Sequence, residues 1–155
     1  MEKLIIIVVS LALLVVIALF VLGYRSQSGA APGMADGRLQ PCPETPNCVC
    51  SEYEANAEHF IEPLALVADS AIPVRQQLAE EIREMGGVIR EQREDYVAAT
   101  FTPSIFRYVD DLEIRVDVAA GQIHLRSASR VGRSDLGANR ARVERLKAAL
   151  QSNVS

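Results

Sequence analysis

An unbroken apolar run near the start of the chain sets the strongest limit on the fold. Residues 4–22 contain a single polar side chain, Ser10. As a helix rising about 1.5 Å per residue, this run would measure roughly 28 Å, close to the hydrocarbon thickness of a bilayer. A helix that is apolar on every side has no place on the surface of a soluble domain. The run therefore predicts one transmembrane helix, followed by enough chain for one domain.

The apolar run fits either a permanent anchor or a cleaved signal peptide, and its length favours the anchor. The apolar part of a secretory signal is usually about 7–15 residues long and ends at small residues. Residues 23–25 form a poor cleavage site, whereas Gly29-Ala30-Ala31 is a candidate one. Because short N-terminal tails usually stay in the cytoplasm, we expect a single-pass protein of the inner, or cytoplasmic, membrane. Its domain would then lie on the periplasmic or extracytoplasmic side.

The chain after the run changes composition twice. Residues 23–40 are rich in glycine, serine and alanine and show no apolar period, which is typical of a flexible linker. The periodic patterns of strands and helices occupy the remainder. We therefore expect a transmembrane anchor over residues 4–22, a linker over 23–40 and a single domain over 41–150.

Three cysteines, Cys42, Cys48 and Cys50, lie in a proline-rich segment at the start of the predicted domain. The prolines exclude a helix and favour tight turns. A bridge between Cys42 and Cys48 would close a small loop, and a disulfide fits an oxidising compartment. Three alternatives stay open: metal ligation, a nucleophilic thiolate served by His59 or His124, and inert buried thiols. The spacing does not match a zinc finger or ribbon, so no metal is predicted.

The remaining pattern predicts an α+β domain. Apolar alternation and composition predict strands over residues 59–66, 88–92, 96–102, 106–118 and 123–130. One helix opens at Pro73 and stops at Gly86, and a second is capped by Ser134 or Asp135. The apolar stripe of this last helix comprises Leu136, Val143, Leu146 and Leu150. Hairpin-linked strands pair antiparallel, so we expect an antiparallel sheet of about five strands covered by two helices, after the transmembrane helix.

Polar residues on the apolar faces of two predicted strands form the first candidate site. Asp110 shares a strand face with leucine and isoleucine, and Ser127 and Ser129 do the same on the next strand. A buried polar group without a partner costs about 1–3 kcal/mol, so these side chains must meet one another or another polar group. They form either the floor of a pocket or caps on neighbouring backbone.

A polar and basic stretch supplies the second candidate site. Its residues are Arg126, Arg130, Ser134, Asp135, Asn139 and Arg140, which run from a strand through a glycine turn into a helix N-terminus. Free N–H groups and guanidinium groups in such a place can hold a phosphate or a carboxylate. The alternative is a structural network, because Asp135 stands in the anion's place. In that network Arg126 and Arg130 pair with carboxylates across the hairpin.

Three motifs of the chain resemble a known family. They are Leu39-x-Pro41-Cys42-Pro43-x-x-Pro46-Asn47-Cys48-Val49, Phe106-Arg107-Tyr108-Val109-Asp110-Asp111, and the stretch from Arg126-Ser127-Ala128-Ser129-Arg130 to Asn139-Arg140. Together they resemble the domain of unknown function 1499 family, uncharacterised bacterial and plastid envelope proteins. The resemblance implies a small exported or membrane-attached domain and supplies no activity. It also implies that Cys42 and Cys48 form the pair and that Cys50 is the odd cysteine.

The distribution of charged residues and the absence of known motifs limit the classes of function that the chain can have. Residues 44–119 carry 16 acidic and 6 basic side chains, whereas residues 120–155 carry 7 basic and 2 acidic ones. Such asymmetry indicates either an anion-facing or lipid-facing end, or attraction between the two parts within one fold. The basic stretch lacks interleaved aromatic residues, so nucleic-acid binding is not expected. No nucleotide-binding or protease motif is present, and no cofactor is predicted.

We therefore expect a non-catalytic binding or accessory module with an anion site. Its partners would be the membrane and an anionic small molecule, a lipid headgroup or a protein. One alternative is a hydrolase that uses Asp110, Ser127 and Ser129, or Cys48, although no nucleophile is paired with a base in the sequence. The other alternative is a structural envelope protein.

Overall fold

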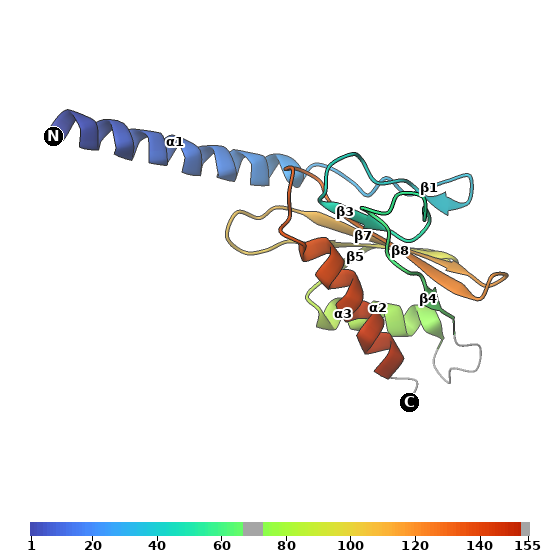
Figure 1. Ribbon diagram of the computed structural model, residues 1–155. Helices are drawn as coiled ribbons and strands as arrows, with labels where there is room; N and C mark the ends of the chain where they lie inside the picture. Colours follow the sequence, from blue (N-terminus) through green and yellow to red (C-terminus); the bar gives the residue numbers. More distant parts are fainter. Residues whose placement is uncertain (67–72, 153–155) are drawn as a thin grey trace.

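A long apolar helix projects from the domain in the computed structural model, which describes residues 1–66 and 73–152 (Figure 1). This helix, α1, spans Glu2–Ser26. It is long and apolar enough to cross a membrane, and its most apolar stretch has no buried residue. The C-terminal end of α1 touches the domain, where Gly23 and Ser26 are buried and the Phe20 ring contacts Phe106. The predicted apolar helix is therefore confirmed by length and composition.

One antiparallel sheet forms the centre of the domain. Its spatial order is β3 (Cys48–Cys50), β8 (Gln122–Ser129), β7 (Asp110–Asp117), β6 (Tyr96–Phe101) and β5 (Val88–Gln92), with β4 (Leu64–Ala65) also paired to β8. The pairing of β7 with β8 runs from Asp110↔Ser129 to Asp117↔Gln122. These are the predicted hairpin strands, and the α+β class is confirmed with a sheet of six strands.

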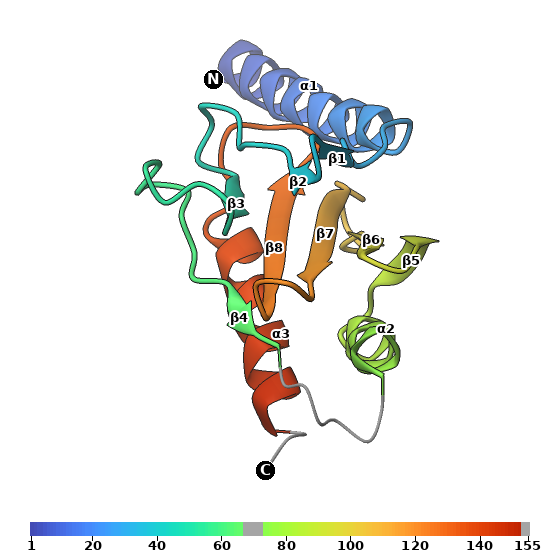
Figure 2. The same cartoon turned by 90° about the vertical axis from the view of Figure 1, so that its right-hand side faces the viewer.

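Both domain helices cover the same face of the sheet (Figure 2). They are α2 (Val74–Glu84) and α3 (Ala138–Ser152). The main core lies between them and the sheet, where Leu78, Ile82 and Leu146 have no exposed surface. Burying side chains of this kind contributes about 1.5–3 kcal/mol each, so this layer provides most of the apolar stabilisation.

The opposite face of the sheet carries a second, thinner layer. A short hairpin of β1 (Met34–Ala35) and β2 (Arg38–Leu39) places Leu39, fully buried, against Tyr96 and Cys50. This hairpin belongs to the segment for which the sequence predicted a flexible linker. Within it Leu39 is buried in the smaller apolar cluster and Met34 packs against that cluster, whereas residues 35–38 are exposed.

Three predicted boundaries were wrong. Strand β7 begins at Asp110 and not at residue 106, because Arg107 has a φ of 58°, which is incompatible with an extended strand. The predicted strand over residues 59–66 is reduced to β4 and an isolated bridge. Leu136 is 97% exposed with a φ of 55°, so it belongs to the turn before α3 and not to its apolar stripe.

Candidate functional site

The disulfide between Cys42 and Cys48 is present, as the family resemblance implied. Their Cα atoms lie 5.6 Å apart. Cys48 therefore has no free thiolate and does not serve as a nucleophile in this structure. Cys50 is a free, buried thiol, and burial raises its pKa. Within residues 1–66 and 73–152, no group of three or more His, Cys, Asp or Glu side chains is arranged to hold a metal ion.

The first candidate site is a closed polar network between the sheet and α3. The Ser127 hydroxyl donates to Asn139 Oδ1 at 2.6 Å, and the Asn139 amide nitrogen donates to Ser129 Oγ at 3.1 Å. Asp110 is paired with Arg142, whose Nη2 lies 2.6 Å from the carboxylate. Ser127 and Asn139 have no exposed surface, so the three predicted residues come together as an interior network and not as the floor of an open pocket.

The helix N-terminus in the second candidate site already holds a negative group. The Asp135 carboxylate accepts the backbone N–H of Asn139 at 2.7 Å and that of Gly137 at 3.1 Å. Ser134 Oγ accepts the N–H of Leu136, and Arg140 donates to two backbone carbonyls of the loop before β4. Asp135 thus acts as the helix cap and occupies the position an anion would take.

The two strand arginines pair with carboxylates across the hairpin. Arg126 Nη1 lies 2.8 Å from Glu113, and Arg130 binds Asp111 through two nitrogens, each at 2.7 Å. Arg130 also donates to the backbone carbonyl of Ser26 at 3.2 Å, which ties the end of α1 to the sheet. The structural network expected as the alternative is therefore the observed arrangement for both side chains.

A buried carboxylate links the sheet to the second layer. Glu113 has no exposed surface and accepts the Tyr96 hydroxyl and the Gly33 N–H, each at 2.8 Å. Burial raises the pKa of Glu113, and the neighbouring Arg126 counters this only in part. Burial and the Glu113 carboxylate both raise the pKa of Tyr96.

A second buried set surrounds Glu52, which the sequence did not single out. Burial favours the protonated form of Glu52, but hydrogen bonds from Arg115 and Arg38 outweigh it, so its pKa is lowered. Next to it, Ser51 Oγ lies 3.3 Å from His124 Nδ1 and also accepts the N–H of Leu125 at 2.8 Å. Burial lowers the pKa of His124. The contacting serine and histidine are both buried, so they anchor β8 to the loop after β3.

A pocket of about 540 Å³ lies where α1 joins the domain. Gln27, residues 29–31, strands β5 and β6 and the β6–β7 loop line it. Its charged side chains are three arginines, Arg90, Arg107 and Arg130, and two carboxylates, Asp111 and Glu91, of which Glu91 pairs with Arg93 at 2.9 Å. Arg130 is neutralised by Asp111, whereas Arg90 donates only to the Thr100 hydroxyl, at 2.9 Å. Among the described residues, nothing pairs with the Arg107 side chain. Arg90 and Arg107, both exposed, therefore line the pocket without a carboxylate partner among the described residues.

Neither Arg90 nor Arg107 was a candidate at the sequence level. The register of β5 shifts between Ile89 and Glu91, and Arg107 lies in a left-handed turn. Both irregularities change which way a side chain points, and neither leaves a trace in an alternating pattern. Arg90 and Arg107 come from separate elements and lie near each other only in the folded chain. Of the three arginines that line the pocket, the sequence analysis therefore predicted only Arg130.

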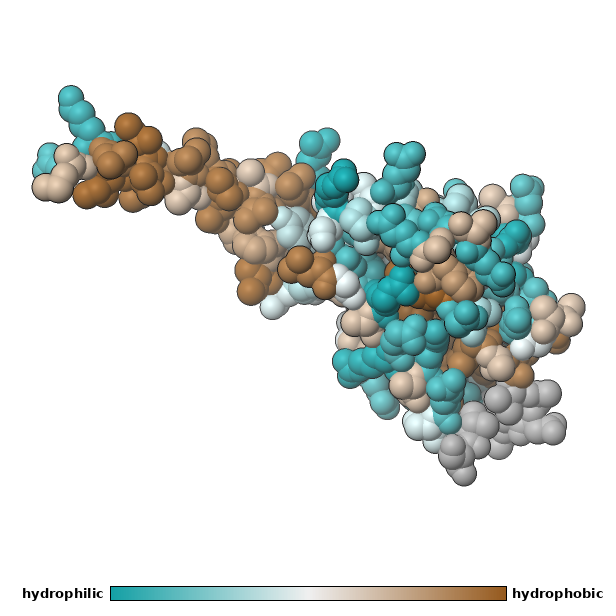
Figure 3. Space-filling view, in the orientation of Figure 1, coloured by the Kyte–Doolittle hydropathy of each residue, from teal (hydrophilic) through white to brown (hydrophobic). Residues whose placement is uncertain are grey.

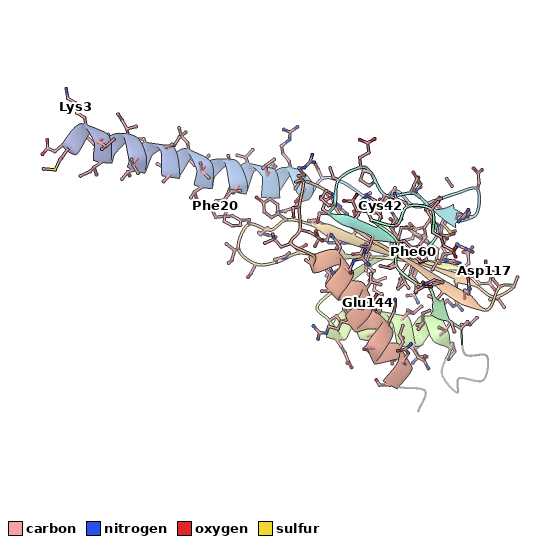
Figure 4. All side chains as sticks on the ribbon, in the orientation of Figure 1. Lys3, Phe20, Cys42, Phe60, Asp117 and Glu144 are labelled. Atoms are coloured by element: carbon pink, nitrogen blue, oxygen red, sulfur yellow. A yellow bond between two sulfur atoms is a disulfide. The ribbon has the colours of Figure 1, made fainter. Side chains whose placement is uncertain are left out.

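The β6–β7 loop, residues 102–109, packs against the last turns of α1. The rings of Phe20 and Phe106 meet edge to face with centroids 5.4 Å apart, and Figure 4 shows Phe20 pointing toward the domain. The Ser26 hydroxyl accepts the N–H of Val109 at 3.1 Å. A Cβ on Gly23 would lie 1.8 Å from the Phe106 carbonyl oxygen, so only glycine allows this approach.

An apolar helix followed by one disulfide-bonded α+β domain defines a class of small proteins with a candidate membrane helix. The model of the DUF1499 family, described as a protein of unknown function, matches residues 38–150 of this chain, and the chain belongs to this family. The match confirms the resemblance found in the motifs. A comparison with curated proteins finds no match.

Proposed function

We propose that this protein is a non-catalytic binding module, anchored by α1 in the inner membrane, whose domain takes up an anionic ligand on the extracytoplasmic side. The observation that carries the proposal is the pocket at the junction of helix and domain, because it contains the unpaired cations Arg90 and Arg107. Guanidinium groups bind carboxylates and phosphates through charge-assisted hydrogen bonds. The proposed anion site is therefore this pocket and not the start of α3, where the sequence analysis expected it. Of the residues predicted for that site, Arg130 also lines the pocket.

Contacts at the end of α1 support a permanent anchor. Cleavage at Gly29-Ala30-Ala31 would remove Ser26, whose hydroxyl and carbonyl bind Val109 and Arg130. The end of α1 therefore contributes hydrogen bonds to the folded domain, and cleavage would remove them. The Cys42–Cys48 bridge supports an oxidising compartment, which agrees with a domain outside the cytoplasm.

The same geometry favours binding over catalysis. The described residues that line the pocket include no serine, cysteine or histidine. The proposed hydrolase residues Asp110, Ser127 and Ser129 are held in the network under α3, where Asp110 pairs with a cation. A nucleophile also needs a base within hydrogen-bond reach, and no described base contacts Ser127.

Ligand-dependent stabilisation of the full chain in detergent tests the proposal. We expect phosphate-bearing or carboxylate-bearing compounds, soluble or lipid, to raise the melting temperature. Replacing the cations by Arg90→Gln and Arg107→Asn should abolish the shift. The matched control is Arg133→Gln, which removes an exposed arginine outside the pocket. Equal shifts in all variants, or no shift with any anion, would leave the scaffold alternative ahead.

Reporter fusions after Ser155 test the sidedness. We expect alkaline phosphatase, which is active only after export, to be active in the fusion, and a fluorescent protein that folds only in the cytosol to be dark. The opposite pair of results would place the domain in the cytoplasm. Thiol titration of the same exported chain should then find one free thiol, that of Cys50.

A further inference from the structure

The β6–β7 loop sits at a defined depth along α1. Phe106 contacts Phe20, and Phe20 is two residues from the end of the apolar run at Leu22, which corresponds to roughly 3 Å along the helix axis. Where α1 spans a bilayer, Phe106 therefore lies at the boundary between the acyl chains and the headgroups. Tyr24, 78% exposed, lies two residues beyond Leu22 on the headgroup side of this boundary, and aromatic side chains are enriched in this region of a bilayer.

The loop presents apolar side chains that the domain does not cover. Ile105 is 71% exposed, and Phe106 and Tyr108 are half-buried with their rings 5.9 Å apart. In the space-filling view the hydrophobic colour of α1 continues below its C-terminal end, where this loop lies in Figure 1 (Figure 3). The exposed apolar surface is thus continuous with the helix that enters the membrane, and this continuity identifies lipid as its partner.

Arg107 joins this apolar loop to the pocket. It stands between Phe106 and Tyr108 in sequence and lines the pocket together with Arg90. Its φ of 58° is unusual for a residue with a side chain, and the Ser26 hydroxyl contacts its carbonyl oxygen at 3.4 Å. The contact to α1 therefore helps to hold a cation at headgroup level, where the available anions are lipid phosphates.

We infer that the pocket binds the phosphate of an anionic phospholipid headgroup from the bilayer that holds α1, with Ile105 and Phe106 seated among its acyl chains. This inference rests on the proposed function and names its ligand class. Arg90 and Arg107 bind the phosphate oxygens, and the loop side chains contact the first carbons of the acyl chains.

A tryptophan scan tests the position of the loop, because the chain contains no tryptophan. The Ile105→Trp variant of the full chain is placed in nanodiscs made with brominated phosphatidylcholine, which quenches tryptophan only in the acyl region. We expect loss of its fluorescence and a blue-shifted emission. The matched control is Val118→Trp, which is 77% exposed in the β7–β8 turn, at the end of the sheet away from α1. Equal fluorescence of the two variants would overturn the placement.

A titration tests the headgroup and separates it from a soluble ligand. The full chain in detergent is titrated with short-chain phosphatidylglycerol, short-chain phosphatidylcholine and glycerol phosphate. We expect phosphatidylglycerol to bind tightest and Arg107→Asn to weaken it about tenfold, the factor expected for one charge-assisted hydrogen bond. Asparagine tolerates a positive φ, so the variant removes the charge without straining the turn. Arg133→Gln should bind as the wild type does.

Each other outcome has a separate meaning. Glycerol phosphate that binds as tightly as phosphatidylglycerol would overturn the lipid inference and leave the proposed anion-binding function standing. Phosphatidylcholine that binds as tightly would show that the net charge of the headgroup is not recognised and would also overturn the inference. If none of the three compounds binds, the lipid inference is overturned. The proposal that the pocket binds phosphate-bearing ligands is then overturned as well.

Discussion

At the scale of single residues, carboxylate–guanidinium pairs organise the interior. Asp110, Asp111 and Glu113 lie close together on β7, with Asp110 on one face of the sheet and Asp111 and Glu113 on the other. Asp110 reaches Arg142 on α3, and the other two reach arginines of β8 on the opposite face. Three of the seven basic residues in the C-terminal part of the chain thus pair with carboxylates of the acidic part. A buried pair of this kind is costly to break, because the remaining charge has no water to solvate it.

Arg142 gives the sharpest stability test of these pairs. Arg142→Leu leaves the Asp110 carboxylate, with 9% of its side chain exposed, without a cation. We expect a loss of about 3 kcal/mol in the free energy of unfolding. The loss would be measured in urea by the fluorescence of the tyrosines. The control Lys147→Gln breaks the pair with Glu144, whose side chain is 55% exposed, so the remaining carboxylate stays solvated and stability should change by less than about 1 kcal/mol. Similar losses in both variants would contradict this account.

His124 makes the stability of the domain depend on pH. Burial lowers its pKa below the ordinary 6.5, so the unfolded chain takes up a proton before the folded chain does. Its stabilising contribution is complete above pH 6.5 and is lost as the pH falls toward the lowered pKa. We expect the wild-type urea midpoint to fall between pH 7.5 and pH 5.5, and that of His124→Gln to fall less. Parallel curves for the two proteins would refute the assignment.

At the scale of elements, the contact between α1 and the β6–β7 loop depends on one glycine. Gly23→Ala places a methyl group where the Phe106 carbonyl oxygen now lies, so the loop must move away from the helix. We expect trypsin to cleave faster after Arg107 in this variant, as followed by mass spectrometry. In the control Gly29→Ala, the new methyl group meets only the flexible Arg130 side chain, at 3.1 Å, and cleavage should stay close to that of the wild type.

The helices and strands also show which parts of the fold can be predicted from the periodicity of apolar residues. Periodicity located α2, α3 and the β7–β8 hairpin, because each buries one regular face. It missed the β1–β2 hairpin, because the glycines and aspartate that its tight turns require also look like linker composition. It missed the turn at Arg107 for a related reason, since a single left-handed residue leaves the apolar alternation intact. The pocket is lined by the turn at Arg107 and by β5, whose register shifts beside Arg90, so these two arginines were not foreseen.

At the scale of the whole molecule, the segment around the disulfide joins the layers on both faces of the sheet. Cys50 packs in the smaller apolar cluster, while the Asn47 carbonyl accepts the Ser129 N–H at 3.0 Å and the Asn139 amide at 2.9 Å. The Cys42–Cys48 bridge closes a short loop and fixes the start of β3 to residue 42. The disulfide therefore lies next to a segment that contacts both layers.

Removing the bridge should destabilise the domain measurably. For a loop with a sequence separation of 6, chain entropy predicts a loss of about 2 kcal/mol in the Cys42→Ser, Cys48→Ser double variant. A reductant should lower the urea midpoint of the wild type and leave that of the double variant unchanged. The control Cys50→Ala keeps the bridge and should retain the response to reductant. A wild-type midpoint that ignores complete reduction would contradict the role of the bridge.

The segment that follows the apolar run of α1, residues 23–40, determines how far the domain can move relative to the helix. A free tether of 18 residues would span about 23 Å on average and would let the domain sweep over its surroundings. The bonds from Ser26 to Val109 and Arg130 and the burial of Leu39 remove that freedom. With α1 in a bilayer, the domain stays at one height and in one orientation, so whatever it recognises has to arrive by diffusion along the lipid surface or from the space just above it.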